Sequence, residues 1–209
     1  MPELSINQVI HAAVRRDVAR TEQALRGLRD GDASRAREIR TAWSNLVREL
    51  THHHEAEDAN IWPFLERRGY DRGLMAEMET EHARMKQALS SASVAIAAVV
   101  TSPTTVHATA AANAVRSCSD VVNDHLDHEE RDVEPLVLQL EDDPEWKALA
   151  KKLRPASIVD AANALAWMQD GAGERERSSL RATIPGPVVS LLTRLLARRY
   201  NREVAPVWR

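Results

Sequence analysis

The sequence has a single cysteine, Cys118, and few aromatic residues, which make up 4% of its 209 positions. One cysteine cannot form an internal disulfide, and the N-terminus lacks the basic segment, apolar run and cleavage site of a secretory signal, so we expect a cytoplasmic protein. No stretch is long and apolar enough to predict a membrane span. The formal net charge of −3 also lacks the basic excess that is typical of nucleic-acid-binding proteins.

Glycine is scarce too, with 7 residues, whereas Ala, Leu, Arg and Glu are abundant. This composition favours helices, and no alternation of apolar and polar residues indicates strands. Apolar residues recur at helical spacing in four long runs. Pro63 should kink or end the second run, and Pro135 lies late in the fourth. The runs cover residues 5–28, 32–69, 70–100 and 104–140.

Four long helices with short connections predict an all-α fold, an up-down-up-down four-helix bundle over residues 5–142. After Pro144 the helical segments are shorter and are divided by proline and glycine, which predicts a helical C-terminal extension over 144–209. Its segments are 145–153, 156–170, 174–182 and 186–201.

Residues 184–202 of the extension combine leucines with arginines in the pattern of an amphipathic basic helix. Such a helix packs its apolar face on the bundle and leaves its arginines in water, or it contacts a membrane surface, a second copy of the chain or a protein partner. Packing on the bundle is the more common of these arrangements, so the sequence favours it.

One pattern occurs twice in the predicted bundle: HHEAEDANIWP at 53–63 aligns without gaps with HLDHEERDVEP at 125–135. The shared skeleton is H-x-x-x-E-[DE]-x-x-[IV]-x-P. A histidine and a glutamate four residues apart lie on the same face of a helix, where both can contact one metal ion. Such pairs also occur on solvated helix faces as hydrogen-bonding pairs. The recurrence of the downstream residues favours a metal site.

Two further histidines lie among the apolar residues of the other two long helices, His11 in the first and His82 in the third. A single core histidine is usually satisfied by a backbone carbonyl. Four helices that each bring one histidine inward instead indicate a metal centre, although a bundle without metal remains an alternative.

Other metal motifs fit less well. Neither histidine cluster completes the H-E-x-x-H pattern of zinc proteases, because Asp58 and Asp132 stand where the second histidine belongs. Ferritin-like proteins place glutamate before histidine at a spacing of three, whereas here histidine comes first at a spacing of four. A histidine and carboxylate shell without thiolates suits iron or manganese, and zinc can substitute.

The segments HHHEAEDANIWPFL, EHARM and DHLDHEERDVEPLV resemble the hemerythrin, or HHE cation-binding, family over residues 5–140. The resemblance implies a left-turning four-helix bundle that holds two iron ions bridged by carboxylates and an oxygen. Glu57 and Glu129 would be the bridging carboxylates. The ligands that the resemblance implies are His11, His53, Glu57, His82, His125 and Glu129.

One position departs from the oxygen carriers of that family, because Lys86 stands where they have a second histidine on the third helix. Lysine at neutral pH has no lone pair for a metal. His54, about 100° around the helix from His53, could replace the missing ligand. Glu130 competes with Glu129 as the last carboxylate, and Glu129 is favoured because it matches Glu57 in the repeat. We expect His52, His107 and His128 to be exposed and not to bind metal.

The resemblance implies that the small ligand is dioxygen, peroxide or nitric oxide rather than an organic substrate. A shell with one histidine fewer would favour turnover, such as peroxide dismutation, over reversible oxygen carriage. The alternative is a sensor or iron-binding module that signals to a partner through the extension without turnover.

Overall fold

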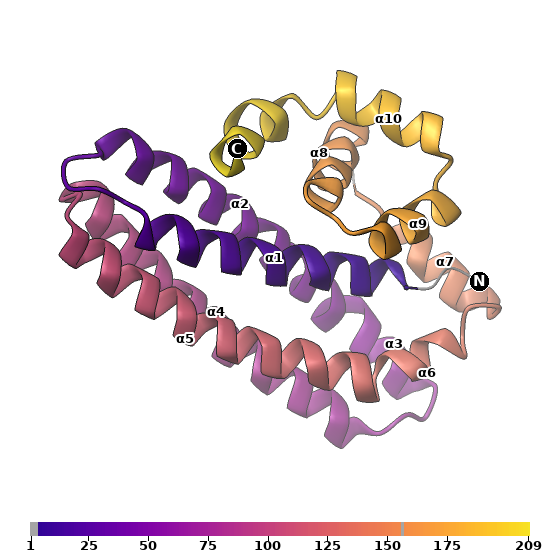
Figure 1. The fold of residues 1–209 in the computed structure, drawn as a ribbon. Helices are drawn as coiled ribbons and strands as arrows, with labels where there is room; N and C mark the ends of the chain where they lie inside the picture. The colour runs from indigo at the N-terminus through magenta and orange to yellow at the C-terminus, as the bar shows by residue number, and fades with distance from the viewer. Residues whose placement is uncertain (1–3, 156) are drawn as a thin grey trace.

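A four-helix bundle occupies the first two-thirds of the computed structural model, which describes residues 4–155 and 157–209. Each long helix packs against its two neighbours around the bundle, and consecutive helices run antiparallel (Figure 1). The described residues contain no strand. The prediction of an all-α, up-down-up-down bundle is therefore confirmed. The four helices are α1 (Ile6–Arg26), α2 (Ala33–Ala56), α4 (Arg72–Thr101) and α5 (Thr105–Asp132).

Polar side chains define where these helices begin. Ser5 accepts a hydrogen bond from the backbone N–H of Gln8, whose side chain bonds back to Ser5, and this forms a capping box. Asp32, Asp71 and Thr104 cap α2, α4 and α5 in the same way with one side-chain oxygen each. These caps fall within two residues of the helix starts that we predicted.

Both copies of the repeated pattern interrupt their helix. After α2 the chain makes a π-helical turn, Glu57–Ile61, and continues as the short helix α3 (Trp62–Arg67). Likewise α5 ends at Asp132 and α6 (Glu134–Leu138) follows. A proline near the start of each short helix has no N–H for the regular helical bond, so the ladder cannot continue. The break expected at Pro63 is confirmed, whereas the single helix expected over 104–140 is wrong.

The apolar faces of the four long helices form a continuous core, in which Cys118 is a small buried residue. A second, smaller cluster closes the end of the bundle where both interrupted helices meet. Its buried members are Trp62, Phe64, Leu65, Met75, Met78 and Val133.

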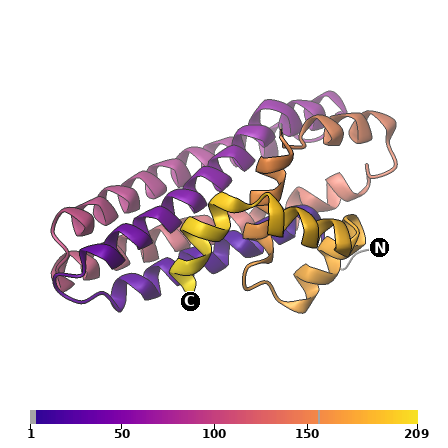
Figure 2. The same ribbon diagram turned by 90° about the horizontal axis from the view of Figure 1, so that it is seen from above.

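Residues 144–209 fold into shorter helices, of which Ile158–Gln169 and Glu174–Thr183 contact α1; Gly186–Leu195 contacts Ile158–Gln169, and the C-terminal turns contact α2 (Figures 1 and 2). The last of these helices ends at Leu195, so the helix expected over 186–201 is too long; a π-helical turn, Tyr200–Val204, and a 3₁₀ turn, Ala205–Trp208, follow. Ala156, where the second segment was expected to begin, lies outside the described residues. The helices are α7 (Pro144–Lys152), α8 (Ile158–Gln169), α9 (Glu174–Thr183) and α10 (Gly186–Leu195).

A buried carboxylate joins this extension to the bundle. Asp17 of α1 is fully buried and accepts a hydrogen bond of 2.9 Å from the indole nitrogen of Trp167 in α8. Arg16 pairs with Asp17 and also donates to the carbonyl oxygen of Trp167 at 2.9 Å. Because apolar residues of α8 and of the C-terminal turns belong to the same core cluster as α1 and α2, the extension packs on the bundle. None of the helices described here is long and apolar enough to cross a membrane.

We expect Trp167→Phe to lower the free energy of unfolding by about 1–3 kcal/mol, because it leaves one oxygen of the buried Asp17 carboxylate without its donor. Chemical denaturation monitored by circular dichroism measures this. Trp146→Phe is the matched control, since the indole N–H of Trp146 has no hydrogen-bond partner among the described residues. An equal decrease in the free energy of unfolding in both variants would contradict the proposed role of the contact between Asp17 and Trp167.

Candidate metal centre

Five histidines and two glutamates from all four long helices converge inside the bundle near its interrupted end. Their side chains are at most 11% exposed. The helical pairs His53–Glu57 and His125–Glu129 face the same interior space, as their four-residue spacing predicts. The residues are His11 from α1, His53 and His54 from α2, Glu57 from the π-helical turn, His82 from α4, and His125 and Glu129 from α5.

The first group of donor atoms lies between α1, α2 and α5. The Nε2 atom of His11 is 3.2 Å from Nε2 of His53 and 3.3 Å from Oε2 of Glu129. The Nε2 atom of His53 is in turn 3.2 Å from Oε1 of Glu57. Nitrogen and oxygen lone pairs this close to one another form a concave donor set of the kind that surrounds a cation.

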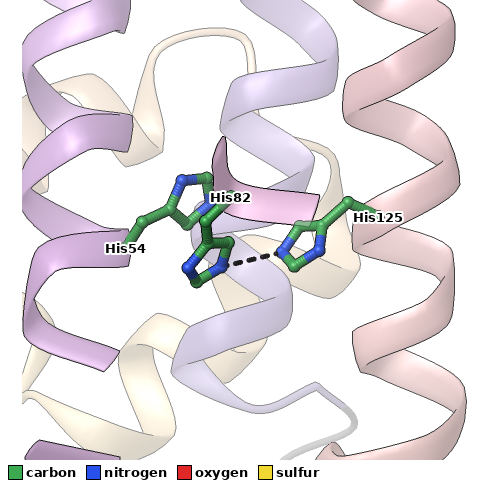
Figure 3. Close-up of side chains that lie close together, drawn as sticks. All are labelled: His54, His82 and His125. Carbon is green, nitrogen blue, oxygen red and sulfur yellow. Dashed lines mark hydrogen bonds between the residues drawn. The ribbon is translucent and has the colours of Figure 1, made fainter. Parts of the chain in front are cut away.

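The second group consists of His54, His82 and His125, whose rings face one another (Figure 3). The Nε2 atoms of His82 and His125 are 3.2 Å apart, and the ring of His54 stacks on that of His82 with 4.1 Å between centroids. One nitrogen from each of the three rings lies within 4.8 Å of the others. The Nε2 atom of His54 is buried and has no hydrogen-bond partner among the described residues.

Glu57 and Glu129 lie between the two groups. Glu57 approaches His53 with one oxygen and His82 with the other, at 3.2 and 3.7 Å. The Oε2 atom of Glu129 is 3.3 Å from His11 and 3.7 Å from His125. In both glutamates Oε2 is buried without a well-directed hydrogen bond. Buried oxygens of this kind are costly unless a cation or donor meets them, so the residues fit a pair of metal ions.

Three carboxylates outside the cluster orient the histidines. The Nδ1 atom of His11 contacts Glu130 at 2.9 Å, that of His82 contacts Asp58 at 2.7 Å, and that of His125 contacts Glu81 at 2.9 Å. A carboxylate that accepts the Nδ1 proton leaves the Nε2 lone pair free and fixes the ring in place. These contacts therefore direct three imidazoles inward.

Neighbouring side chains hold the orienting carboxylates in turn. Arg15 donates to Glu130 at 2.7 Å, the indole nitrogen of Trp62 donates to Asp58 at 3.0 Å, and His128 contacts Glu81 at 2.8 Å. The position of Asp58 depends on the π-helical turn, a feature that is frequent at functional sites.

Sequence analysis did not recognise these orienting residues, although the repeat contained a signal for two of them. Asp58 and Glu130 occupy the shared [DE] position directly after Glu57 and Glu129. Each reaches across to a histidine of a neighbouring helix, Asp58 to α4 and Glu130 to α1. Glu81, which precedes His82, lies outside the repeat and had no such signal.

The structure separates the alternatives that the sequence left open. Glu129 points into the cluster, whereas Glu130 lies behind His11. His54 faces the interior beside His82 and His125. Lys86 is exposed and contributes no donor.

The three histidines that we expected to be exposed and outside the site differ in their surroundings. His52 is exposed. His128 is instead half-buried against Glu81. His107 is half-buried near the start of α5, where its Nδ1 atom lies 2.8 Å from the carbonyl oxygen of Ser102. The expectation of exposure is thus wrong for His107 and His128, because each packs against a polar partner.

The buried charges of the cluster perturb one another strongly. Burial lowers the pKa of His11, but hydrogen bonds with Glu129 and Glu130 outweigh it and raise the pKa to about 9. Burial, and next the charge of His11, lower the pKa of His53 to about 3. Burial and the nearby charge of Glu129 raise the pKa of Glu57 well above its ordinary value. Without metal, His11 is therefore charged at neutral pH, and the protonation equilibrium of Glu57 is shifted toward the neutral acid.

Metal binding at pH 7 should accordingly release at least about one proton per chain, because His11 must lose its proton to present a lone pair to the metal. Raising the pH above the pKa of His11, about 9, should lower the release by about one proton, since that proton is already lost. Anaerobic titration calorimetry with ferrous iron, in buffers of different ionisation enthalpy, measures the number. His52→Ala should release the same number as the wild type. Binding at pH 7 without proton release would contradict these protonation states.

Comparison with protein families agrees with this geometry. Residues 8–137 match the family model described as the hemerythrin HHE cation binding domain. Searches of curated proteins and of solved structures gave no significant match. The matched residues span most of the bundle and include every histidine and glutamate of the cluster. The chain belongs to the hemerythrin HHE cation-binding family.

Proposed function

We propose that this chain is a non-haem di-iron protein that binds or reacts with a small oxidant. The observation that supports this most strongly is the convergence of five imidazoles and two carboxylates with unpartnered buried lone pairs. A mixed nitrogen and oxygen donor set without thiolates suits iron, and manganese or zinc can substitute. The single cysteine is consistent with a cytoplasmic location, which we also propose.

We propose that the seven residues divide between two ions. His11 and His53 would hold one ion, and His54, His82 and His125 the other, with Glu57 and Glu129 bridging them. The two groups of short distances support this division. His54 would thus supply the histidine that is missing at Lys86, which its buried and unpartnered Nε2 atom supports. The proposed centre would then have as many histidines as an oxygen carrier of the family. The absence of a histidine at Lys86 would therefore no longer favour turnover over oxygen carriage.

His54→Ala should lower the bound iron from about two ions to about one per chain, because one ion loses a third of its histidines. Elemental analysis after anaerobic loading and desalting measures it. His52→Ala, an exposed histidine two residues earlier, is the matched control and should keep the wild-type content. An unchanged iron content in His54→Ala would contradict the role of His54.

An iron pair in such a shell supplies reversible binding or redox chemistry toward dioxygen, peroxide or nitric oxide. The chain's own residues exclude larger substrates, because the histidines and glutamates are buried between helices. The group with His11 and His53 has one histidine fewer than the other group, so it leaves more room for a small ligand. Peroxide dismutation is the reaction that we propose to test first, since peroxide needs no separate electron donor.

The iron-loaded protein should release oxygen from hydrogen peroxide, and His53→Ala and Glu57→Ala should abolish most of that release. Each substitution removes a donor that the proposed centre requires. An oxygen electrode measures the rate per bound iron. Equal rates in the wild type and in metal-free variants would contradict dismutation at this centre.

A sensor without turnover is the second candidate, and one observation favours it. Helix α1 carries His11 in the cluster and Asp17, less than two turns later, at the contact with Trp167 of the extension. A movement of His11 on oxidation would therefore reach the extension through one rigid helix. The sensor hypothesis predicts that hydrogen exchange in α8 changes between the reduced and oxidised iron-loaded protein. Unchanged exchange together with rapid turnover would favour the enzyme.

A further inference from the structure

Helix α10 has an apolar face that nothing in the described structure covers. Val188, Leu191 and Leu195 follow one another at helical spacing and are 45, 60 and 56% exposed. Val189 points the other way and is buried. Apolar side chains therefore lie on two sides of α10. Packing against the rest of the extension buries the side with Val189 and leaves the other side exposed.

Exposed apolar side chains are concentrated in this part of the molecule. Among residues 4–155 and 157–209, eight large hydrophobic residues are strongly exposed, and five of them belong to α10 and to the first turn of α8, which packs against α10. Ile158 and Val159 are the two from α8. Figure 1 shows α10 at the outer edge of the molecule, on the opposite side of α1 and α2 from α4 and α5. Clustered exposed apolar residues at an outer edge indicate a contact surface.

Unpaired positive charges adjoin the apolar face. Arg194 lies beside Leu191 and Leu195 on the same helix, and Arg198 lies just beyond the end of that helix. Both are exposed, and the side chain of neither has an ion-pair or hydrogen-bond partner among the described residues. Residues 144–209 carry 12 Lys and Arg against 6 Asp and Glu, whereas residues 1–143 carry 16 against 25. Positive charge is therefore gathered in the extension.

We propose that this face, formed by Val188, Leu191, Leu195, Arg194 and Arg198, attaches the protein reversibly to the surface of an anionic phospholipid membrane. On such a membrane the leucine side chains would lie at the boundary between the headgroups and the acyl chains, and the arginines would contact the lipid phosphates. The apolar side chains and the positive charges of the face would then both have partners. The acidic bundle lies on the far side, away from the lipid charge. This attachment is independent of the iron centre and of its chemistry.

Sedimentation of the full-length protein with vesicles tests the proposal. The protein should bind vesicles of phosphatidylcholine with phosphatidylglycerol, and binding should weaken in high salt and be absent with phosphatidylcholine alone. Leu191→Ser with Leu195→Ser should weaken binding at least about fivefold, and so should Arg194→Gln with Arg198→Gln. These positions are exposed, so the variants should fold, which circular dichroism checks.

Val94→Ser with Val106→Ser is the matched control, because it removes two apolar side chains of the bundle that are 69 and 75% exposed. This variant should bind vesicles as the wild type does. Failure to bind anionic vesicles, or binding that the α10 variants leave intact, would overturn the proposal. A dimer that the leucine substitutions dissolve, in a protein that does not bind vesicles, would also overturn it and would assign the face to a second copy of the chain.

Discussion

The hydrogen bonds between carboxylates and the outer nitrogens of the cluster histidines are the constraint on which the centre depends. They fix the orientation of the His11, His82 and His125 rings, so that Nδ1 faces a carboxylate and Nε2 turns inward. Without them, the buried imidazoles of His11, His82 and His125 would be free to rotate. Because each bond joins two different helices, the same contacts that orient the ligands also hold the bundle in register at this end.

The internal repeat has a physical explanation in these contacts. Helices α2 and α5 lie diagonally across the bundle, and each contributes a histidine, an inward glutamate and a following acid. The acid that follows each inward glutamate contacts a histidine of an adjacent helix: Asp58 contacts His82, and Glu130 contacts His11. In the first copy the regular helix ends at Ala56, so that Glu57 and Asp58 lie in the π-helical turn; in the second it ends at Asp132, just beyond Glu130. A single sequence unit thus supplies a ligand pair to the centre and an orienting group to the adjacent helix.

Helical periodicity and end signals predicted the fold because both are local. Ser5, Asp32 and Thr104 cap helices within two residues of the expected starts. The π-helical turn after Ala56 and the contact of Asp17 with Trp167 could not be predicted, since they arise from packing between distant segments. His54 illustrates the same limit. Its angle on the helix is compatible with the interior, but only the positions of α4 and α5 decide that it faces His82 and His125.

We propose that seven side chains of this one chain hold two metal ions in two unequal groups. Anomalous diffraction at the iron edge, from crystals of iron-loaded protein purified without a histidine tag, tests it most directly. We predict two peaks about 3.5–4 Å apart, one beside His11 and His53 and the other beside His54, His82 and His125. A single peak, or two peaks with His54 beyond bonding distance of either, would contradict it.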